Sequence, residues 1–287
     1  MTGLTDYSAK GQLEWLTGRQ GMPVTVPNVF MALFTGVGSD SGAGFIEVST
    51  AGTGYARPQI AGATTGWSGA AGQPVITMTP PVPSWIQTGM YAFDRTTPAN
   101  IGGLAGLTIL SINTGTGAVT LSGNLSGSVS GDTIAFSAFG AVVPSGPSTI
   151  SNTSQINFPT ALSSWGTVNS FGLYDASGGG NLLDWDYLGN FVWLPATVAP
   201  PGNTVTVPRH GYSVNDPVVF TTEFGGAPPS PALSGIQTVT GVTSDNFTVA
   251  GTNTTTGNGS VRKIVQQSVP TGVTASFVPS ALVLTAA

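Results

Sequence analysis

The sequence predicts an all-β protein: a β-sandwich or barrel core with one short N-terminal helix and two inserted small β modules. Three observations predict this class. Turn-forming residues recur at short intervals, with 41 Gly and 21 Pro in 287 residues, and helical periodicity is confined to one segment. Two parts of the chain repeat one β-rich pattern. Hydrophobic residues make up 40% of the chain, so folding is expected although only 7% of residues are charged.

The single expected helix lies near the start of the chain. Thr5 or Asp6 is its expected N-cap and Gly18 its expected end. Its apolar residues recur at i, i+4 and i+7: Ala9, Leu13 and Leu16. Gly11 lies inside it and costs roughly 1 kcal/mol relative to Ala, so packing on its own domain or on a neighbouring subunit must hold this helix.

Strands are expected in the rest of the core. The apolar run 29–35, bounded by Pro27 and Gly36, predicts a buried strand. Pro58 makes the stretch 55–60 an expected edge strand, because proline cannot donate to a ladder. Alternating or apolar stretches predict further strands at 149–158 (ended by Pro159), 168–175, 181–188 and 276–285, with a loop or hairpin tip at 178–180.

The repeated pattern consists of an apolar strand that ends in Phe, followed by a hairpin and a glycine. Its first copy is residues 85–93 (WIQTGMYAF) with 107–123 (LTILSINTGTGAVTLSG). Its second copy is residues 212–220 (YSVNDPVVF) with 236–251 (IQTVTGVTSDNFTVAG). We therefore predict the same strand order in the segments 85–123 and 212–251.

Clusters of Pro and Gly suggest where the inserts begin and end. They divide the chain into a discontinuous core (residues 1–67, 146–195 and 265–287), a first module (68–145) and a second module (196–264). Insertion is tolerated where loop ends lie close together at a surface. We expect the core to remain foldable when residues 196–264 are replaced by a short Gly linker.

Low charge is the most unusual property of the composition. The net charge is −5, and no charged side chain occurs from Thr133 to Tyr174. Such a surface packs easily against copies of itself, which favours an obligate homo-oligomer over a free monomer, the alternative being simply a polar all-β protein. The few Lys and Arg are scattered, so nucleic acid is not an expected partner.

Other features restrict location and stability. No apolar run reaches the roughly 18 residues of a membrane span, and the start lacks the pattern of a secretory signal. Cysteine is absent, so we expect no disulfide and no Cys-ligated metal.

Two features are candidates for chemistry. Asp184 and Asp186 lie at i and i+2 of an expected strand, where they could form an acid–base or metal-binding pair. The favoured interpretation is two solvent-facing carboxylates that flank a buried Trp185, because no third metal ligand is identifiable. His210 is the only histidine and lies in a turn without a nucleophile elbow, which favours a local backbone contact over a catalytic triad. We therefore expect no enzyme activity and no catalytic, cofactor-binding or metal-binding residues.

The tryptophans allow two interpretations. A receptor-binding protein could use them as a sugar-stacking platform, which would make a host-surface glycan a partner. Burial in the core or in an interface is the default for Trp in an all-β protein. The five residues concerned are Trp67, Trp85, Trp165, Trp185 and Trp193.

Several short blocks carry a resemblance to a known family. They are, in order, 30–36 (FMALFTG), 45–49 (FIEVS), 54–58 (GYARP), 151–153 (SNT), 156–161 (INFPTA), 164–168 (SWGTV), 171–176 (FGLYDA) and 179–185 (GGNLLDW). The chain resembles tailed-bacteriophage and prophage virion structural proteins of the type labelled tail-fibre or minor structural protein. Shorter members of that family lack the two inserts. The inserts themselves resemble small β modules found in many phage structural proteins.

The resemblance implies a virion structural protein of the tail-fibre or tail-associated type, assembled in the bacterial host cytoplasm, which acts by self-assembly and attachment. Its expected partners are other copies of itself, with a trimer favoured by family analogy, and other virion proteins, namely tail or neck proteins or the major capsid protein. One alternative is a capsid decoration, cement or head-fibre protein that stabilises the shell. A carbohydrate-active enzyme is a further alternative, which would need paired carboxylates such as Asp184 and Asp186.

Overall fold

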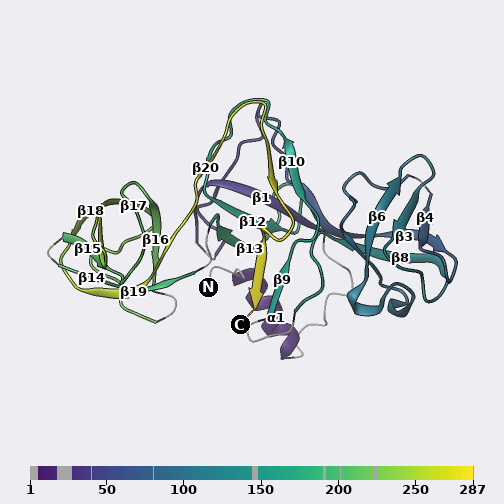
Figure 1. Ribbon diagram of the computed structural model, residues 1–287, viewed down its shortest axis with the longest axis horizontal. Helices are drawn as coiled ribbons and strands as arrows, with labels where there is room; N and C mark the ends of the chain where they lie inside the picture. Colours follow the sequence, from purple (N-terminus) through teal and green to yellow (C-terminus); the bar gives the residue numbers. More distant parts are fainter. Residues whose placement is uncertain are drawn as a thin grey trace.

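The computed structural model describes residues 6–17, 28–39, 41–79, 81–143, 148–189, 192–200, 202–222 and 225–286. The predicted all-β class is confirmed, because nearly all regular structure in these residues is strand. Three β lobes lie along the long axis of the molecule, with the central lobe between two barrels (Figure 1). The helical exceptions are α1 (Asp6–Leu16) and two 3-10 turns, η1 (Pro98–Asn100) and η2 (Gly103–Ala105).

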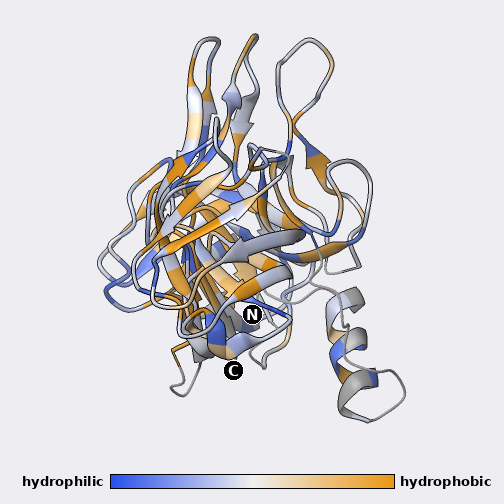
Figure 2. Cartoon of the chain, turned by 90° about the vertical axis from the view of Figure 1, so that its right-hand side faces the viewer, coloured by the Kyte–Doolittle hydropathy of each residue, from blue (hydrophilic) through white to orange (hydrophobic). Residues whose placement is uncertain are grey.

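The helix α1 confirms the expected N-terminal helix. It begins at Asp6 and ends at Leu16, while Thr5 and Gly18 lie outside the described residues. Thr17 Oγ1 donates a hydrogen bond to Leu13 O at 2.7 Å, which satisfies a carbonyl of the last turn. The helix contacts the central sheet at β13 and stands beside the β structure (Figure 2).

The central lobe has two layers. One layer is a sheet in which neighbouring strands follow the order β13-β12-β1-β3, with β2 also paired to β1. Its strands are β1 (Val29–Gly36), β2 (Ile46–Glu47), β3 (Gln59–Gly69), β12 (Ser170–Tyr174) and β13 (Leu182–Tyr187).

The other layer is a two-stranded antiparallel ribbon that runs through three successive pairings. The strands β9 (Ser148–Ser151), β10 (Ile156–Thr160) and β11 (Gly166–Val168) pair with the C-terminal strands β22 (Val283–Ala286), β21 (Thr274–Phe277) and β20 (Gln267–Val269), respectively. We call residues 148–168 and 267–286 the terminal ribbon.

Strand β1 is buried on both faces, which explains its continuous apolar run. Met31 and Leu33 belong to the core cluster under the terminal ribbon, whereas Ala32 and Phe34 belong to a second cluster on the opposite face. Gly172 of β12 is required beside Phe34, because a Cβ there would lie 2.7 Å from Phe34 Cε2.

Barrel 1 is formed by β3 together with five strands that follow it in the chain. These are β4 (Val75–Met78), β5 (Tyr91–Asp94), β6 (Leu107–Asn113), β7 (Ala118–Leu121) and β8 (Val129–Ser137). Their neighbours follow the order β3-β4-β7-β6-β5-β8, and β8 pairs back to β3 to close the ring.

Barrel 2 has the same strand order. Its strands are β14 (Leu194–Ala199), β15 (Gly202–Thr206), β16 (Pro217–Thr221), β17 (Ile236–Val242), β18 (Asn246–Asn253) and β19 (Gly257–Lys263). They close as β14-β15-β18-β17-β16-β19. In both barrels the neighbours are therefore the first, second, fifth, fourth, third and sixth strands in chain order. The predicted common strand order of 85–123 and 212–251 is confirmed.

Within these repeats the first predicted strand was placed too early. Strand β5 begins at Tyr91, because the preceding residues form turns in which Ile86 N donates to Pro83 O at 3.0 Å. Strand β16 begins at Pro217, after a turn in which Asp216 N donates to Ser213 O at 3.1 Å.

Several predictions for the core strands were wrong. Residues 55–58 form no strand, and β3, which begins at Gln59, pairs on both sides and is not an edge strand. The predicted strand 168–175 is split at Asn169, whose N–H donates to Phe34 O at 3.0 Å. The predicted strand 149–158 is split around Asn152, and β10 continues through Pro159 to Thr160 with an irregular register. The predicted final strand 276–285 is likewise split into β21 and β22.

The two barrels differ in how they join the centre. Barrel 1 and the central lobe share one hydrophobic cluster, which includes Phe136 and Leu33. Barrel 2 has its own cluster, which includes Phe247 and Val249. The boundary expected between residues 67 and 68 falls inside β3. The strands of barrel 2 run from Leu194 in β14 to Lys263 in β19, close to the bounds 196–264 expected for the second module. The division into a core and two inserts remains a prediction.

Because the cores are separate, shortening a buried side chain in one core should destabilise mainly the lobes that share that core. Phe136 and Phe247 are 0% and 1% exposed, and replacing a buried Phe with Ala costs about 3–5 kcal/mol. We expect Phe247→Ala to accelerate hydrogen exchange mainly in β14–β19, and Phe136→Ala to accelerate it in both barrel 1 and the central sheet. Hydrogen exchange with mass spectrometry checks this. Equal acceleration along the whole chain by Phe247→Ala would contradict independent cores.

Candidate functional site

A buried ion pair joins barrel 2 to the central sheet. Arg262 of β19 is 1% exposed, and its guanidinium donates to both carboxylate oxygens of Asp186 on β13. The guanidinium carbon lies 4.7 Å from the centre of the Trp193 ring and 5.4 Å from that of Tyr187. Arg262 Nε is buried without a hydrogen-bond partner. Two aromatic rings and one carboxylate therefore hold this cation in place.

Apolar packing surrounds this ion pair. Val219 and Ile264 of the barrel-2 side are buried together with Phe34, Leu182 and Trp185 of the central sheet. The junction therefore combines a desolvated charge pair with a continuous apolar contact between barrel 2 and the central sheet.

The expectation of two solvent-facing carboxylates was wrong for Asp186. Its side chain is 14% exposed and is neutralised by Arg262. Asp184 is half-buried, and its Oδ1 accepts a hydrogen bond from Trp185 N at 2.7 Å. Trp185 is buried as expected. Sequence reasoning missed Arg262; the available signal was an arginine at the end of a strand in a chain with few charges.

His210 is held by backbone groups within barrel 2, as favoured from the sequence. Its Nδ1 accepts a hydrogen bond from Tyr212 N at 2.8 Å. Its Nε2 lies 3.1 Å from Thr243 O and 3.2 Å from Asn246 O, so the proton belongs on Nε2. The ring packs against Phe247. Both ring nitrogens are therefore occupied by backbone partners, which is a structural role.

A second arginine clamps the loop between β12 and β13. Arg57 binds Glu47 through Nε at 2.7 Å and Nη2 at 2.6 Å, and its Nη1 donates to Ala176 O and Gly179 O. Its guanidinium carbon lies 3.6 Å from the centre of the Tyr174 ring. Burial alone would lower the pKa of Arg57, but the hydrogen bonds and charge of Glu47 raise it above the ordinary value.

The tryptophans lie mostly inside the molecule. Trp67, Trp165 and Trp185 are 0%, 4% and 5% exposed, so none of these three presents a ring face to solvent. Trp85 and Trp193 are half-buried, and the Trp193 ring is already stacked on Arg262. The five rings serve packing in this arrangement.

Asn152 ties the terminal ribbon together. It is fully buried, and its Nδ2 donates to Ser154 O and Val278 O, both at 2.9 Å. Its Oδ1 accepts from Leu282 N at 2.9 Å, while its backbone bonds Leu282 O and Ser280 N. One side chain therefore satisfies the backbone where the C-terminal segment changes from β21 to β22.

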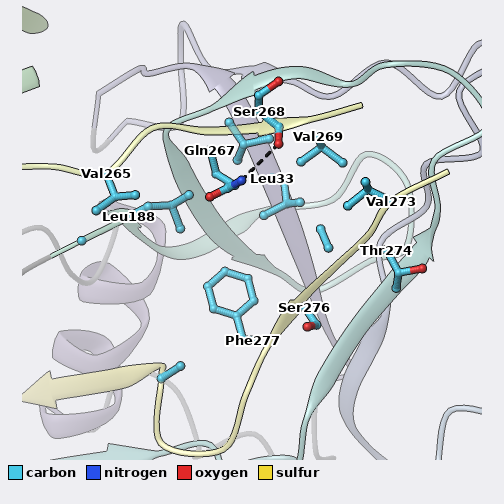
Figure 3. Close-up of a pocket in the computed structure, with 14 residues that line it drawn as sticks. Leu33, Leu188, Val265, Gln267, Ser268, Val269, Val273, Thr274, Ser276 and Phe277 are labelled. Carbon is cyan, nitrogen blue, oxygen red and sulfur yellow. Dashed lines mark hydrogen bonds between the residues drawn. The ribbon is translucent and has the colours of Figure 1, made fainter. Parts of the chain in front are cut away.

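A pocket of about 540 Å³ opens beside the terminal ribbon. Figure 3 shows Leu33, Val269 and Phe277 around it, together with the polar Gln267 and Ser268. Most of its lining comes from the C-terminal segment, and none of the lining side chains is charged. This chemistry suits an apolar or neutral polar occupant.

Two carboxylates of barrel 1 also interact. Asp94 is 1% exposed, and its Oδ1 accepts hydrogen bonds from the N–H groups of Thr96 and Thr97, both at 2.8 Å. Burial and the neighbouring Asp94 raise the pKa of Asp132 above its ordinary value.

Neither carboxylate pair has the surroundings of a metal site. In the described part of the chain, no three His, Cys, Asp or Glu side chains lie together in a way that could hold a metal ion. None of the helices described there has the length and apolar character that a membrane-spanning helix requires.

The comparisons with known proteins point to a phage fibre-type protein. Residues 114–190 match the family model described as podophage GP4 fiber I protein gp80. The matched segment runs from the β6–β7 turn through β13 and includes Asn152 and Asp186. It also contains the blocks 151–153, 156–161, 164–168, 171–176 and 179–185 that carried the resemblance seen in the sequence. No curated protein and no solved structure matches the chain.

The Arg262–Asp186 pair predicts a specific pattern of stability. Removing one partner of a buried ion pair costs about 3–5 kcal/mol, because the other charge is left uncompensated. We expect that loss for Arg262→Ala in urea unfolding, and a near-neutral effect when Arg262→Met is combined with Asp186→Leu. Lys263→Ala is the matched control, because Lys263 pairs with Asp216 but is 45% exposed and should lose about 1 kcal/mol or less. Equal losses for Arg262→Ala and Lys263→Ala would contradict this assignment.

Asp132 predicts a pH dependence. The pKa of Asp132 is higher in the folded chain, so the folded chain binds this proton more tightly than the unfolded chain does. The free energy of unfolding therefore falls as pH rises from the pKa of the unfolded chain, about 4, through the raised pKa of the folded chain. We expect Asp132→Asn to remove this decrease, so that the variant gains stability over the parent at pH 7 but not at pH 3. Thermal unfolding at the two pH values measures it. A variant no more stable than the parent at pH 7 would refute the effect.

Proposed function

We propose that this chain is a structural, non-enzymatic component of a phage fibre, attached to the virion and assembled in the host cytoplasm. The single observation that carries the proposal is the match of residues 114–190 to the fibre family model. That segment contains β9–β13, the centre of the fold, and not only a peripheral module.

The architecture supports a mechanical role. Two barrels of the same strand order flank one central lobe. Each is joined to the centre by buried contacts, through a shared cluster for barrel 1 and through Arg262 for barrel 2. Such junctions transmit load and hold the barrels in a fixed direction.

The polar groups that could have served catalysis are engaged in structure. Asp186 neutralises Arg262, and both nitrogens of His210 bond to backbone groups. These contacts support a role in cohesion and attachment. We further propose that the chain forms a homo-oligomer, a trimer by analogy with phage fibres, and contacts other virion proteins.

The proposal has two forms, which differ in where on the virion the chain is attached. We favour a tail-associated fibre because the match is to a fibre family. A head-fibre or capsid decoration protein is the second candidate, favoured by the compact barrels.

Quantitative densitometry of purified virions, against the major capsid protein, tests the proposal. We expect the chain in the particles, at far fewer copies than the capsid protein and at the tail in immunogold images. A copy number comparable to that of the capsid protein would favour the decoration role. Absence from purified particles, with the chain present in infected cells, would overturn the proposed function.

A further inference from the structure

We propose that the terminal ribbon is the surface through which copies of this chain pack against one another. This inference rests on the proposed function only in that a fibre component self-associates.

The ribbon carries no charged side chain. Residues 133–174 and 264–287 contain none, and neither do residues 58–93 and 96–131, most of which belong to barrel 1. The two segments of the ribbon, 148–168 and 267–286, fall within the first two of these stretches and pair with each other. The fold therefore gathers two distant uncharged segments into one layer.

The outward side of this layer is neutral and exposed. On β10 and β21, Asn157, Thr160, Thr274 and Ser276 are exposed, and the hydroxyls of Thr160 and Thr274 lie 2.8 Å apart. Large apolar side chains project beside them: Leu162 is 70% exposed, Val278 57% and Val273 41%.

The C-terminal strands also present free edges. Among the described residues, β20, β21 and β22 each pair with one strand only. Natural proteins usually protect such edges with charged residues, which would repel a second chain. Here the edge carries no charge. The short strands, together with Pro270 and Pro279, limit strand addition along it, so side chains carry most of a contact at this layer.

The pocket adjoins the same segment. Val273, Thr274, Ser276 and Phe277 line it, so the ribbon offers an uncharged recess next to its exposed apolar side chains. An apolar side chain from a neighbouring molecule can fill such a recess without leaving a charge unpaired.

A second copy of the chain is the occupant that this chemistry favours. An interface between copies buries the same side chains in every subunit, so any charge in it is desolvated unless the neighbouring copy supplies an opposite charge. With a net charge of −5, copies of this chain repel one another, and the ribbon is a layer where contact brings no like charges together. A charged partner would find no complementary group on it.

Charge insertion on the full chain tests the assignment. We expect the parent to form a discrete oligomer in sedimentation velocity. Leu162→Glu combined with Val278→Glu should raise the dissociation constant at least about tenfold, equivalent to 1.4 kcal/mol. The matched control is Leu110→Glu combined with Val242→Glu, which places the same charges on side chains of the barrels that are 61% and 42% exposed and should leave the dissociation constant within about twofold, since surface changes away from an interface have little effect.

Thermal unfolding verifies that each variant folds. Should the double variant fail to fold, Ser276→Lys on the outer face of β21 replaces it, with the same expected dissociation. A monomeric parent, or equal dissociation by ribbon and barrel variants, would overturn the proposal. The two proposals fail in different ways: a monomer found in virions would remove this interface and the proposed homo-oligomer but leave the virion role, and an oligomer absent from virions would remove only the fibre role.

Discussion

The central lobe depends on the antiparallel pairing of two segments that are far apart in sequence. Residues 267–286 follow both barrels in the chain and pair with residues 148–168 in the central lobe. This return places Phe277, Val269 and Leu282 in the main hydrophobic cluster. Asn152 supplies the hydrogen bonds where the returning segment bends. Such long-range pairing must offset the loop-closure entropy of the intervening chain.

The barrels satisfy a related geometric constraint. Pairing of the first and last strands, β3 with β8 and β14 with β19, closes each ring and brings its entry and exit together. A closed ring removes strand edges, so each barrel can be inserted into another sheet without exposing its own. Three ion pairs hold separate segments of the chain together. They are Arg57 with Glu47 at a loop, Arg262 with Asp186 at a lobe junction and Lys263 with Asp216 inside barrel 2.

Local patterns allowed prediction of the class and of the repeated unit. The run 29–35 became β1, and the hairpins of the two repeats occupy equivalent places in the two barrels. The breaks at Asn152 and Asn169 could not be predicted, since they depend on bonds to Leu282 and Phe34, remote in the chain. Asp186 was misjudged for the same reason: period-2 alternation places a carboxylate outward, whereas its partner Arg262 approaches from another lobe.

In the interface that we propose, copies of this chain cohere through neutral contacts. Sedimentation velocity of the full chain across salt concentrations tests the neutral character of that cohesion most directly. Contacts between exposed charges weaken when the screening length falls from about 30 Å at 0.01 M salt to about 3 Å at 1 M. The account predicts an oligomer whose dissociation constant does not rise with salt, because screening weakens only the repulsion between the net charges of the copies. Dissociation as salt rises, or a monomer at every salt concentration, would contradict it.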